Sequence, residues 1–209
     1  MTENQRPDNL THEAALSRLK AGNARASSDA SEHPRSDAAR RAELVGGQRP
    51  FVTVLACADS RVSPELVFDE GLGDLFVIRV AGNIIDDAIL GSIEYAGLHL
   101  GVNLVVVMGH QSCGAVTAAV DNVDVEGPAT HCHVDSLIDA IRPAVQRGAA
   151  DVVDASIRAN ARQVAEAIGS SEPVLAGLAA SGMRSVPAYY SLETGEVHPD
   201  PAVVFADRH

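Results

Sequence analysis

The chain has 209 residues, of which 46% are apolar and 3% aromatic, and it contains no tryptophan. This length and composition favour one domain whose core is filled mainly by aliphatic side chains. The formal net charge of −12 argues against a surface for nucleic acid or for an anionic membrane, because both need concentrated Lys and Arg.

Two further features bear on the location of the protein. Residues 1–7 are polar without an apolar signal region, and no apolar run approaches the roughly 18 residues that a membrane span needs. The three cysteines, Cys57, Cys113 and Cys132, do not make a disulfide framework. We therefore expect a soluble cytoplasmic protein that uses two of its cysteines for metal binding or catalysis.

Two predicted helices come first and form an N-terminal helical arm over residues 1–50. Residues 10–26 have a short helical stripe of Ala and Leu, with Thr11 as a candidate N-cap. A polar loop over 27–36 leads to a second short helix over 37–44, which Gly46 and Gly47 end. Because both helices are only weakly apolar, we expect them to pack against something else, such as another subunit.

Strands alternate with helices in the remaining residues, 51–209. Apolar runs predict strands over 51–56, 75–80, 104–108 and 184–191, with Gly109 breaking the third of them. Helices are expected from Asp86 to Leu100, from a Ser112 N-cap to about Val120, and over 134–146, 150–168 and 172–180, where Pro143 ends or kinks the third. The tail from His198 is expected to lie along the surface. This alternation predicts an α/β fold with a mostly parallel central sheet flanked by helices.

Chemistry-bearing side chains cluster in two segments, Cys57-Ala58-Asp59-Ser60-Arg61 and His110-Gln111-Ser112-Cys113-Gly114. Each segment begins where a predicted strand ends. Ligand sites of open parallel sheets form beyond the carboxyl ends of the strands, so Cys57 and His110 can converge. Cys113 stands at the start of a helix, where backbone N–H groups and the helix dipole favour a thiolate.

Two thiolates and one imidazole are good ligands for Zn²⁺, and three protein ligands leave the fourth position open for water. Asp59, held by Arg61, could accept a hydrogen bond from a zinc-bound hydroxide and orient its lone pair. Alternatively, Asp59 could swing onto the metal as a fourth ligand. The plainer interpretations are buried core cysteines and a structural Asp59–Arg61 surface pair.

The pattern C-x-D-S-R followed about fifty residues later by H-x-x-C-G resembles the β-class carbonic anhydrases. Four flanking segments extend the resemblance over about residues 10–197. They are Leu19-Lys20-Ala21-Gly22-Asn23-Ala24-Arg25, Gly71-Leu72-Gly73-Asp74-Leu75-Phe76-Val77-Ile78-Arg79, Ala81-Gly82-Asn83 and Gly91-Ser92-Ile93-Glu94-Tyr95-Ala96.

The resemblance implies a zinc-dependent enzyme that reversibly hydrates a small-molecule substrate, carbon dioxide, to bicarbonate and a proton. It implies one Zn²⁺ per chain held by Cys57, His110 and Cys113, with Asp59 and Arg61 as the catalytic dyad. Residues 51–209 would then be the zinc-binding catalytic domain. Members of the family are dimers or larger, so a homodimer or homotetramer is expected, with the N-terminal helices wrapped over the neighbouring subunit.

The sequence departs from the family pattern at three points. Ala26 stands where an aromatic is frequent, and Pro187 stands where the last strand frequently has glycine, so we expect an edge or an irregularity there. The tryptophan that accompanies an inhibitory bicarbonate pocket in some members is absent, and that kind of allostery is not expected.

Alternative functions stay open from the sequence. The same fold and zinc site hydrolyse carbon disulfide in some relatives, and a permanently closed site with Asp59 on the zinc would be non-enzymatic. A redox dithiol of Cys57 and Cys113 is disfavoured because the spacing is not C-x-x-C. His131-Cys132-His133 invites a second metal site, but a solvated loop is the favoured interpretation.

Overall fold

The computed structural model describes residues 9–200, whose centre is one five-stranded sheet with the strand order β2-β1-β3-β4-β5. The strands are β1 (Val52–Ala56), β2 (Leu75–Arg79), β3 (Leu104–His110), β4 (Arg184–Tyr190) and β5 (Val197–Pro199). The pairs β1–β2, β1–β3 and β3–β4 are parallel, whereas β5 runs antiparallel to β4. The predicted fold class is therefore confirmed.

Eight α-helices connect or flank these strands within the described part of the chain. They are α1 (His12–Ser27), α2 (Ala38–Glu43), α3 (Pro64–Val67), α4 (Asp87–Leu100), α5 (Gly114–Asp121), α6 (Val134–Ile141), α7 (Val152–Ser170) and α8 (Val174–Ala180). The side chain of Thr11 caps α1 as predicted, and the side chain of Asp86 caps α4, because each accepts a bond from the backbone N–H three residues on. Pro143 lies in a short 3₁₀ turn, Arg142–Ala144, that ends α6. Within residues 9–200, no helix combines the length and the apolar character needed to cross a membrane.

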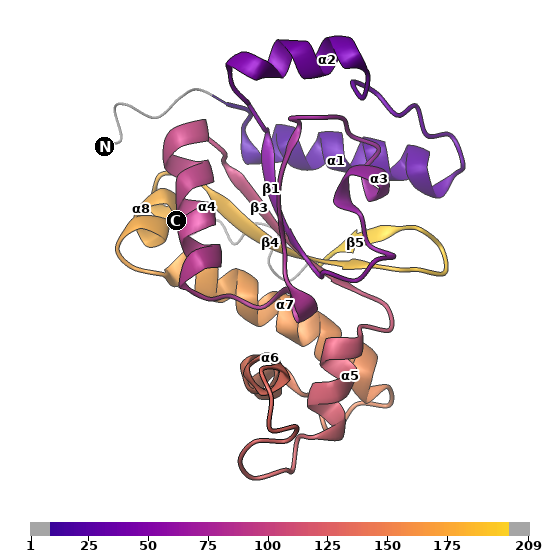
Figure 1. The fold of residues 1–209 in the computed structure, drawn as a ribbon, viewed down its shortest axis with the longest axis vertical. Helices are drawn as coiled ribbons and strands as arrows, with labels where there is room; N and C mark the ends of the chain where they lie inside the picture. The colour runs from indigo at the N-terminus through magenta and orange to yellow at the C-terminus, as the bar shows by residue number, and fades with distance from the viewer. Residues whose placement is uncertain (1–8, 201–209) are drawn as a thin grey trace.

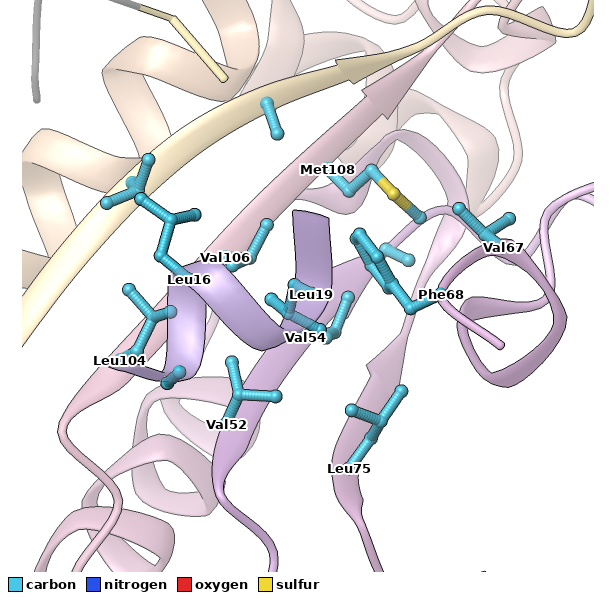
Figure 2. Close-up of a cluster of buried hydrophobic side chains, with 14 of the residues drawn as sticks. Leu16, Leu19, Val52, Val54, Val67, Phe68, Leu75, Leu104, Val106 and Met108 are labelled. Carbon is cyan, nitrogen blue, oxygen red and sulfur yellow. The ribbon is translucent and has the colours of Figure 1, made fainter. Parts of the chain in front are cut away.

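The sheet is buried on both faces, which is why its strands are continuous apolar runs. Figure 1 shows α1 and α3 on one side of the sheet, and α4, α7 and α8 on the other. On the first face, Leu16 and Leu19 of α1 pack with Val54 of β1, as the cluster in Figure 2 shows. On the second face, Val107 of β3 packs with Ile168 of α7.

Helix α1 packs against this chain's own sheet, so its apolar stripe is buried without a second subunit. The stripe consists of Ala15, Leu16 and Leu19. The polar side of α1 is tied down as well, because Arg25 Nε donates to Asp69 Oδ2 at 2.6 Å. A narrow apolar stripe is therefore enough when arginines pair with buried carboxylates beside it. Helix α2, by contrast, has no buried residue.

Two local predictions around β3 are wrong. The strand continues through Gly109 to His110. Gly109 does not break it, because the glycine serves packing: a Cβ there would lie 2.9 Å from Ile157 Cγ2 of α7. Ser112 does not cap α5, since Cys113 is the N-cap and makes no side-chain capping bond, whereas Ser112 adopts a φ of 57°.

The start of the tail forms a strand. His198 belongs to β5 at the edge of the sheet, pairs with Tyr189 and is exposed, which agrees with a surface position. Pro187 lies just before the stretch of β4 that pairs with β5, where its carbonyl accepts a bond from the N–H of Asp200 at 2.9 Å. This position agrees with the edge that was expected at the proline. The predictions for residues 1–7 and beyond 200 lie outside the described residues.

Candidate metal centre

The two parallel strands β1 and β3 bring the first two candidate ligands together. Ala56, the last residue of β1, is in register with Met108 of β3, so Cys57 and His110 leave the same edge of the sheet. Cys113 follows on the first turn of α5. The ligand atoms of these three buried residues all lie within 4.8 Å of one another.

The geometry of the three side chains fits a zinc ion. Two thiolates on a tetrahedral zinc, each with a Zn–S bond of about 2.3 Å, have their sulfurs about 3.8 Å apart. The sulfurs of Cys57 and Cys113 are 3.9 Å apart. His110 Nε2 is buried and has no hydrogen-bond partner among the described residues. An orphaned ring nitrogen beside two sulfurs is a donor set that a metal ion would satisfy.

The second ring nitrogen of His110, Nδ1, has a partner that determines the tautomer of the ring. Nδ1 lies 3.0 Å from the carbonyl oxygen of Gln111. A proton on Nδ1 donated to this carbonyl leaves the lone pair of Nε2 pointing at the sulfurs. The backbone that follows β3 therefore selects the tautomer that binds a metal.

The contact between the two cysteine sulfurs shifts the pKa values of the two thiols in opposite directions. A hydrogen bond from Cys113 lowers the pKa of Cys57 to about 4 against the effect of burial, and His110 and the backbone N–H of Gly82 act in the same direction. The pKa of Cys113 is raised, because its proton is shared with the Cys57 sulfur and the site is buried. A divalent cation would have to displace that proton from Cys113.

Asp59 and Arg61 form a bidentate pair beside this centre. Arg61 Nε donates to Asp59 Oδ1 at 2.9 Å and Nη2 donates to Oδ2 at 2.7 Å, while the Arg61 backbone N–H adds a third bond of 3.0 Å. The hydrogen bond from the Arg61 side chain is the main reason why the pKa of Asp59 is lowered. Asp59 Oδ2 lies 3.9 Å from His110 Nε2, and Asp59 is not part of the ligand group itself.

Two further residues hold the site, and the sequence analysis did not single them out. Arg79, at the end of β2, donates to the carbonyls of Cys57 (3.1 Å) and Asp59 (2.6 Å). Asn160 of α7 donates to the carbonyl of Gly82 at 2.9 Å. The signal for Arg79 was a charged side chain at the carboxyl end of a strand; nothing local marks Asn160 beyond a polar side chain in a helix.

The His131–His133 segment does not form a second metal group. Within residues 9–200, the only cluster of ligand atoms suited to a metal is that of Cys57, His110 and Cys113. Cys132 is exposed, and the backbone around it is ordered by Asp135, which accepts bonds from the N–H groups of Thr130 and Cys132. The loop interpretation of this segment agrees with these contacts.

Comparison with known proteins finds a matching family model and relatives that align with most of the chain. A family model described as "Carbonic anhydrase" matches residues 52–197. A carbonic anhydrase of Mycolicibacterium smegmatis is 41% identical over 188 residues, which cover 88% of this chain and 91% of that protein.

Solved structures are similar over most of the chain. The β-carbonic anhydrase CafA of Aspergillus fumigatus is 26% identical with a TM-score of 0.68, covering 91% of this chain and 90% of that one. Two tetrameric β-carbonic anhydrases of Sordaria macrospora were solved together, and one chain from that work, 23% identical, has a TM-score of 0.68 with coverage of 90% and 96%.

Proposed function

The chain belongs to the β class of the carbonic anhydrase family, and we propose that Cys57, His110 and Cys113 hold the zinc ion with which it reversibly hydrates carbon dioxide to bicarbonate and a proton. It is a carbonate dehydratase, a lyase that uses zinc. The observation that carries the residue assignment is the convergence of three buried ligand atoms, one of them an orphaned imidazole nitrogen.

The chemistry that zinc supplies when bound is a water whose pKa falls to about 7. Cys57, His110 and Cys113 would hold the ion, and three protein ligands would leave a position open for that water. The buried surroundings of the cysteines keep bulk solvent away from the sulfurs.

Asp59 is placed to orient the nucleophile. Its Oδ2 atom lies beside the ligand group, 3.9 Å from His110 Nε2. There it can accept a hydrogen bond from the nucleophile and so direct a lone pair of the nucleophile at the substrate. Arg61 keeps this carboxylate ionised and holds both of its oxygens. Arg79 fixes the backbone on which Cys57 and Asp59 stand.

The same contacts favour an open site over one that Asp59 closes. To reach the metal, Asp59 would have to give up its two bonds from the Arg61 side chain and the bond from the Arg61 backbone. Charge-assisted bidentate bonds are among the strongest that a carboxylate makes in a protein. Arg61 therefore competes with the metal for Asp59 and supports the enzymatic interpretation.

The test is carbon dioxide hydration by purified protein of known zinc content, with Asp59→Ala beside the wild type. A matched control is Asp139→Ala, because Asp139 is an exposed partner of Arg142 at 3.3 Å. We expect about one zinc per chain in all three proteins, with hydration lost only in Asp59→Ala. Bound zinc without hydration by the wild type at any pH would overturn the proposal.

We further propose that the active protein is a homodimer or homotetramer. The Sordaria macrospora proteins are described as tetrameric. In this chain β2 is an edge strand, and near it Leu72 and Tyr95 are 40% and 46% exposed. An unpaired edge beside exposed apolar side chains favours association. Sedimentation at micromolar concentration tests this, and a monomer there would refute it.

We also propose a cytoplasmic location. The two buried cysteines form no disulfide, a state that a reducing compartment maintains. Fractionation of the source cells tests the proposal, and recovery of the protein outside the cytoplasm would refute it.

A further inference from the structure

A chain of contacts runs from helix α7 to the sulfur of Cys57. Asn160 Nδ2 donates to the carbonyl oxygen of Gly82 at 2.9 Å, and the backbone N–H of Gly82 donates to Cys57 Sγ at 3.3 Å. Asn160 is 1% exposed, and Cys57 is 4% exposed. Both hydrogen bonds are therefore shielded from water.

Gly82 is the flexible joint in this chain of contacts. It adopts a φ of 71° inside the short turn Ala81–Asn83, where the absence of a side chain leaves its two peptide groups free to rotate. Ile141 limits the space, because a Cβ at Gly82 would lie 2.5 Å from its Cδ1 atom. The bond from Asn160 fixes the peptide group between Gly82 and Asn83, and this narrows the directions that the N–H of Gly82 can take.

The amide of Asn160 has no other evident use. Its Oδ1 atom is buried and has no hydrogen-bond partner among the described residues. A buried, half-satisfied amide costs stability relative to an apolar side chain of the same size. Packing and stability therefore do not explain an asparagine here, whereas the bond to Gly82 does.

We propose that Asn160 is a positioning residue, which acts through Gly82 to keep a backbone N–H on the sulfur of Cys57. This inference rests on the proposed role of Cys57 as a zinc ligand. A hydrogen bond to a thiolate holds the sulfur in the orientation that a metal needs and lowers the energy of its lone pairs, so its loss leaves the ligand less well positioned. Loss of such an outer contact weakens metal binding by about 10-fold or more.

The test uses Asn160→Leu, which keeps the volume and removes the donor, and Asn160→Ala, which avoids any steric conflict. Ser156→Ala is the matched control: Ser156 lies one turn earlier in α7, is 0% exposed, and also holds a backbone group, the N–H of Gln146 at 2.9 Å. Two properties are measured on each folded protein, namely the rate of zinc release to a chelator and the thiolate-to-metal absorption band of the Co²⁺-substituted form.

Both Asn160 variants should release zinc about 10-fold faster than wild type, and their absorption band should move to longer wavelength because the sulfur lone pairs are less stabilised. Ser156→Ala should keep the wild-type band and release rate even where its thermal stability falls. If the Asn160 variants match Ser156→Ala in both properties, the inference is overturned. If wild-type protein shows no thiolate band, or if Cys57→Ser leaves the band at its full wild-type intensity although one of the two thiolates is gone, the assignment of Cys57 as a ligand fails instead.

Discussion

Replacing Gly22 of α1 by alanine sets intrinsic helix propensity against a steric conflict, and the structure indicates that the conflict has the larger effect. Alanine is favoured over glycine inside a helix by about 1 kcal/mol. However, a Cβ at Gly22 would lie 1.9 Å from the carbonyl oxygen of Phe68, and real Cβ contacts stay beyond 3.0 Å. Helix α1 and the Phe68 segment would therefore have to separate by about 1 Å.

The separation would disturb contacts on both sides of Gly22. Leu19 and Phe68 belong to the same buried cluster (Figure 2), and Asn23 donates to the carbonyl of Val67 at 3.0 Å. Overpacking of this kind costs typically about 1–3 kcal/mol, which exceeds the gain in helix propensity. We expect Gly22→Ala to lower the free energy of unfolding by about 2 kcal/mol.

Gly91 of α4 provides the comparison. It is exposed, and nothing lies within 4 Å of the position that its Cβ would take. Gly91→Ala should therefore show helix propensity alone and raise the free energy of unfolding by about 0.5–1 kcal/mol. The two substitutions are chemically identical and should have opposite signs.

Urea unfolding followed by circular dichroism measures both variants, at one protein concentration and one zinc concentration, because association and metal binding shift apparent stability. The slope of the free energy against urea should stay that of the wild type. A Gly22→Ala midpoint equal to or above that of the wild type would refute the reasoning, since it would mean that α1 can move away from Phe68 without loss.

Three other outcomes follow from the site and the ion pairs. Arg61→Lys keeps the charge but loses the fork that holds both oxygens of Asp59, so hydration should fall about 10- to 100-fold at unchanged zinc content, and a wild-type rate would contradict the dyad. Burial raises the pKa of Asp69, but the bond from Arg25 and two backbone N–H groups outweigh it and leave the pKa below its ordinary 3.8. A carboxyl group whose pKa is lowered by folding stabilises the fold at pH values above its ordinary pKa, and this stabilisation is lost as the pH falls through the lower pKa of the folded state. The melting temperature of Asp69→Asn should therefore lie below that of the wild type at pH 6, and the difference should narrow below pH 3.8. A difference that stays constant with pH would contradict this. Chelation should lower the melting temperature, and zinc at 100 times its dissociation constant should restore about 2.7 kcal/mol, whereas an unchanged melting curve would count against a bound ion.

The convergence of the candidate ligands could be predicted because it follows from chain periodicity. Apolar runs before Cys57 and His110 mark strands, and neighbouring parallel strands present their carboxyl ends at one edge. The third candidate needs only the first turn of a helix after β3. The structure brings these residues together as the sequence led us to expect, and the outline of the sheet follows from the same runs.

The wrong predictions share a different cause. Whether Gly109 breaks a strand or admits a helix depends on Ile157, which is far away in the sequence. Likewise, Arg79 and Asn160 act on backbone groups of distant segments, and no local pattern indicates which carbonyl such a side chain will reach. Residues that carry chemistry themselves are visible from spacing, whereas residues that hold them in place are visible only from the fold.

Arginine side chains occur both beside the candidate catalytic residues and among the residues that hold the fold together. All but one of the 16 basic residues are arginine, although the chain is strongly acidic. Arg18 grips the buried Glu70 through Nε and Nη2, just as Arg61 grips Asp59. A planar guanidinium can hold both oxygens of a carboxylate, which lysine cannot do.

The same fork therefore serves two purposes, and its surroundings decide which. The Glu70 side chain is 2% exposed and pairs with Arg18 and Arg35, so it ties α1 and the loop after α1 to the segment between α3 and β2. The Asp59 side chain is 18% exposed and has one arginine partner, and its second oxygen also faces the orphaned nitrogen of His110. A carboxylate held rigidly but not enclosed can still accept a bond from a reacting group, and this is the physical difference on which we base the proposed catalytic role of Asp59.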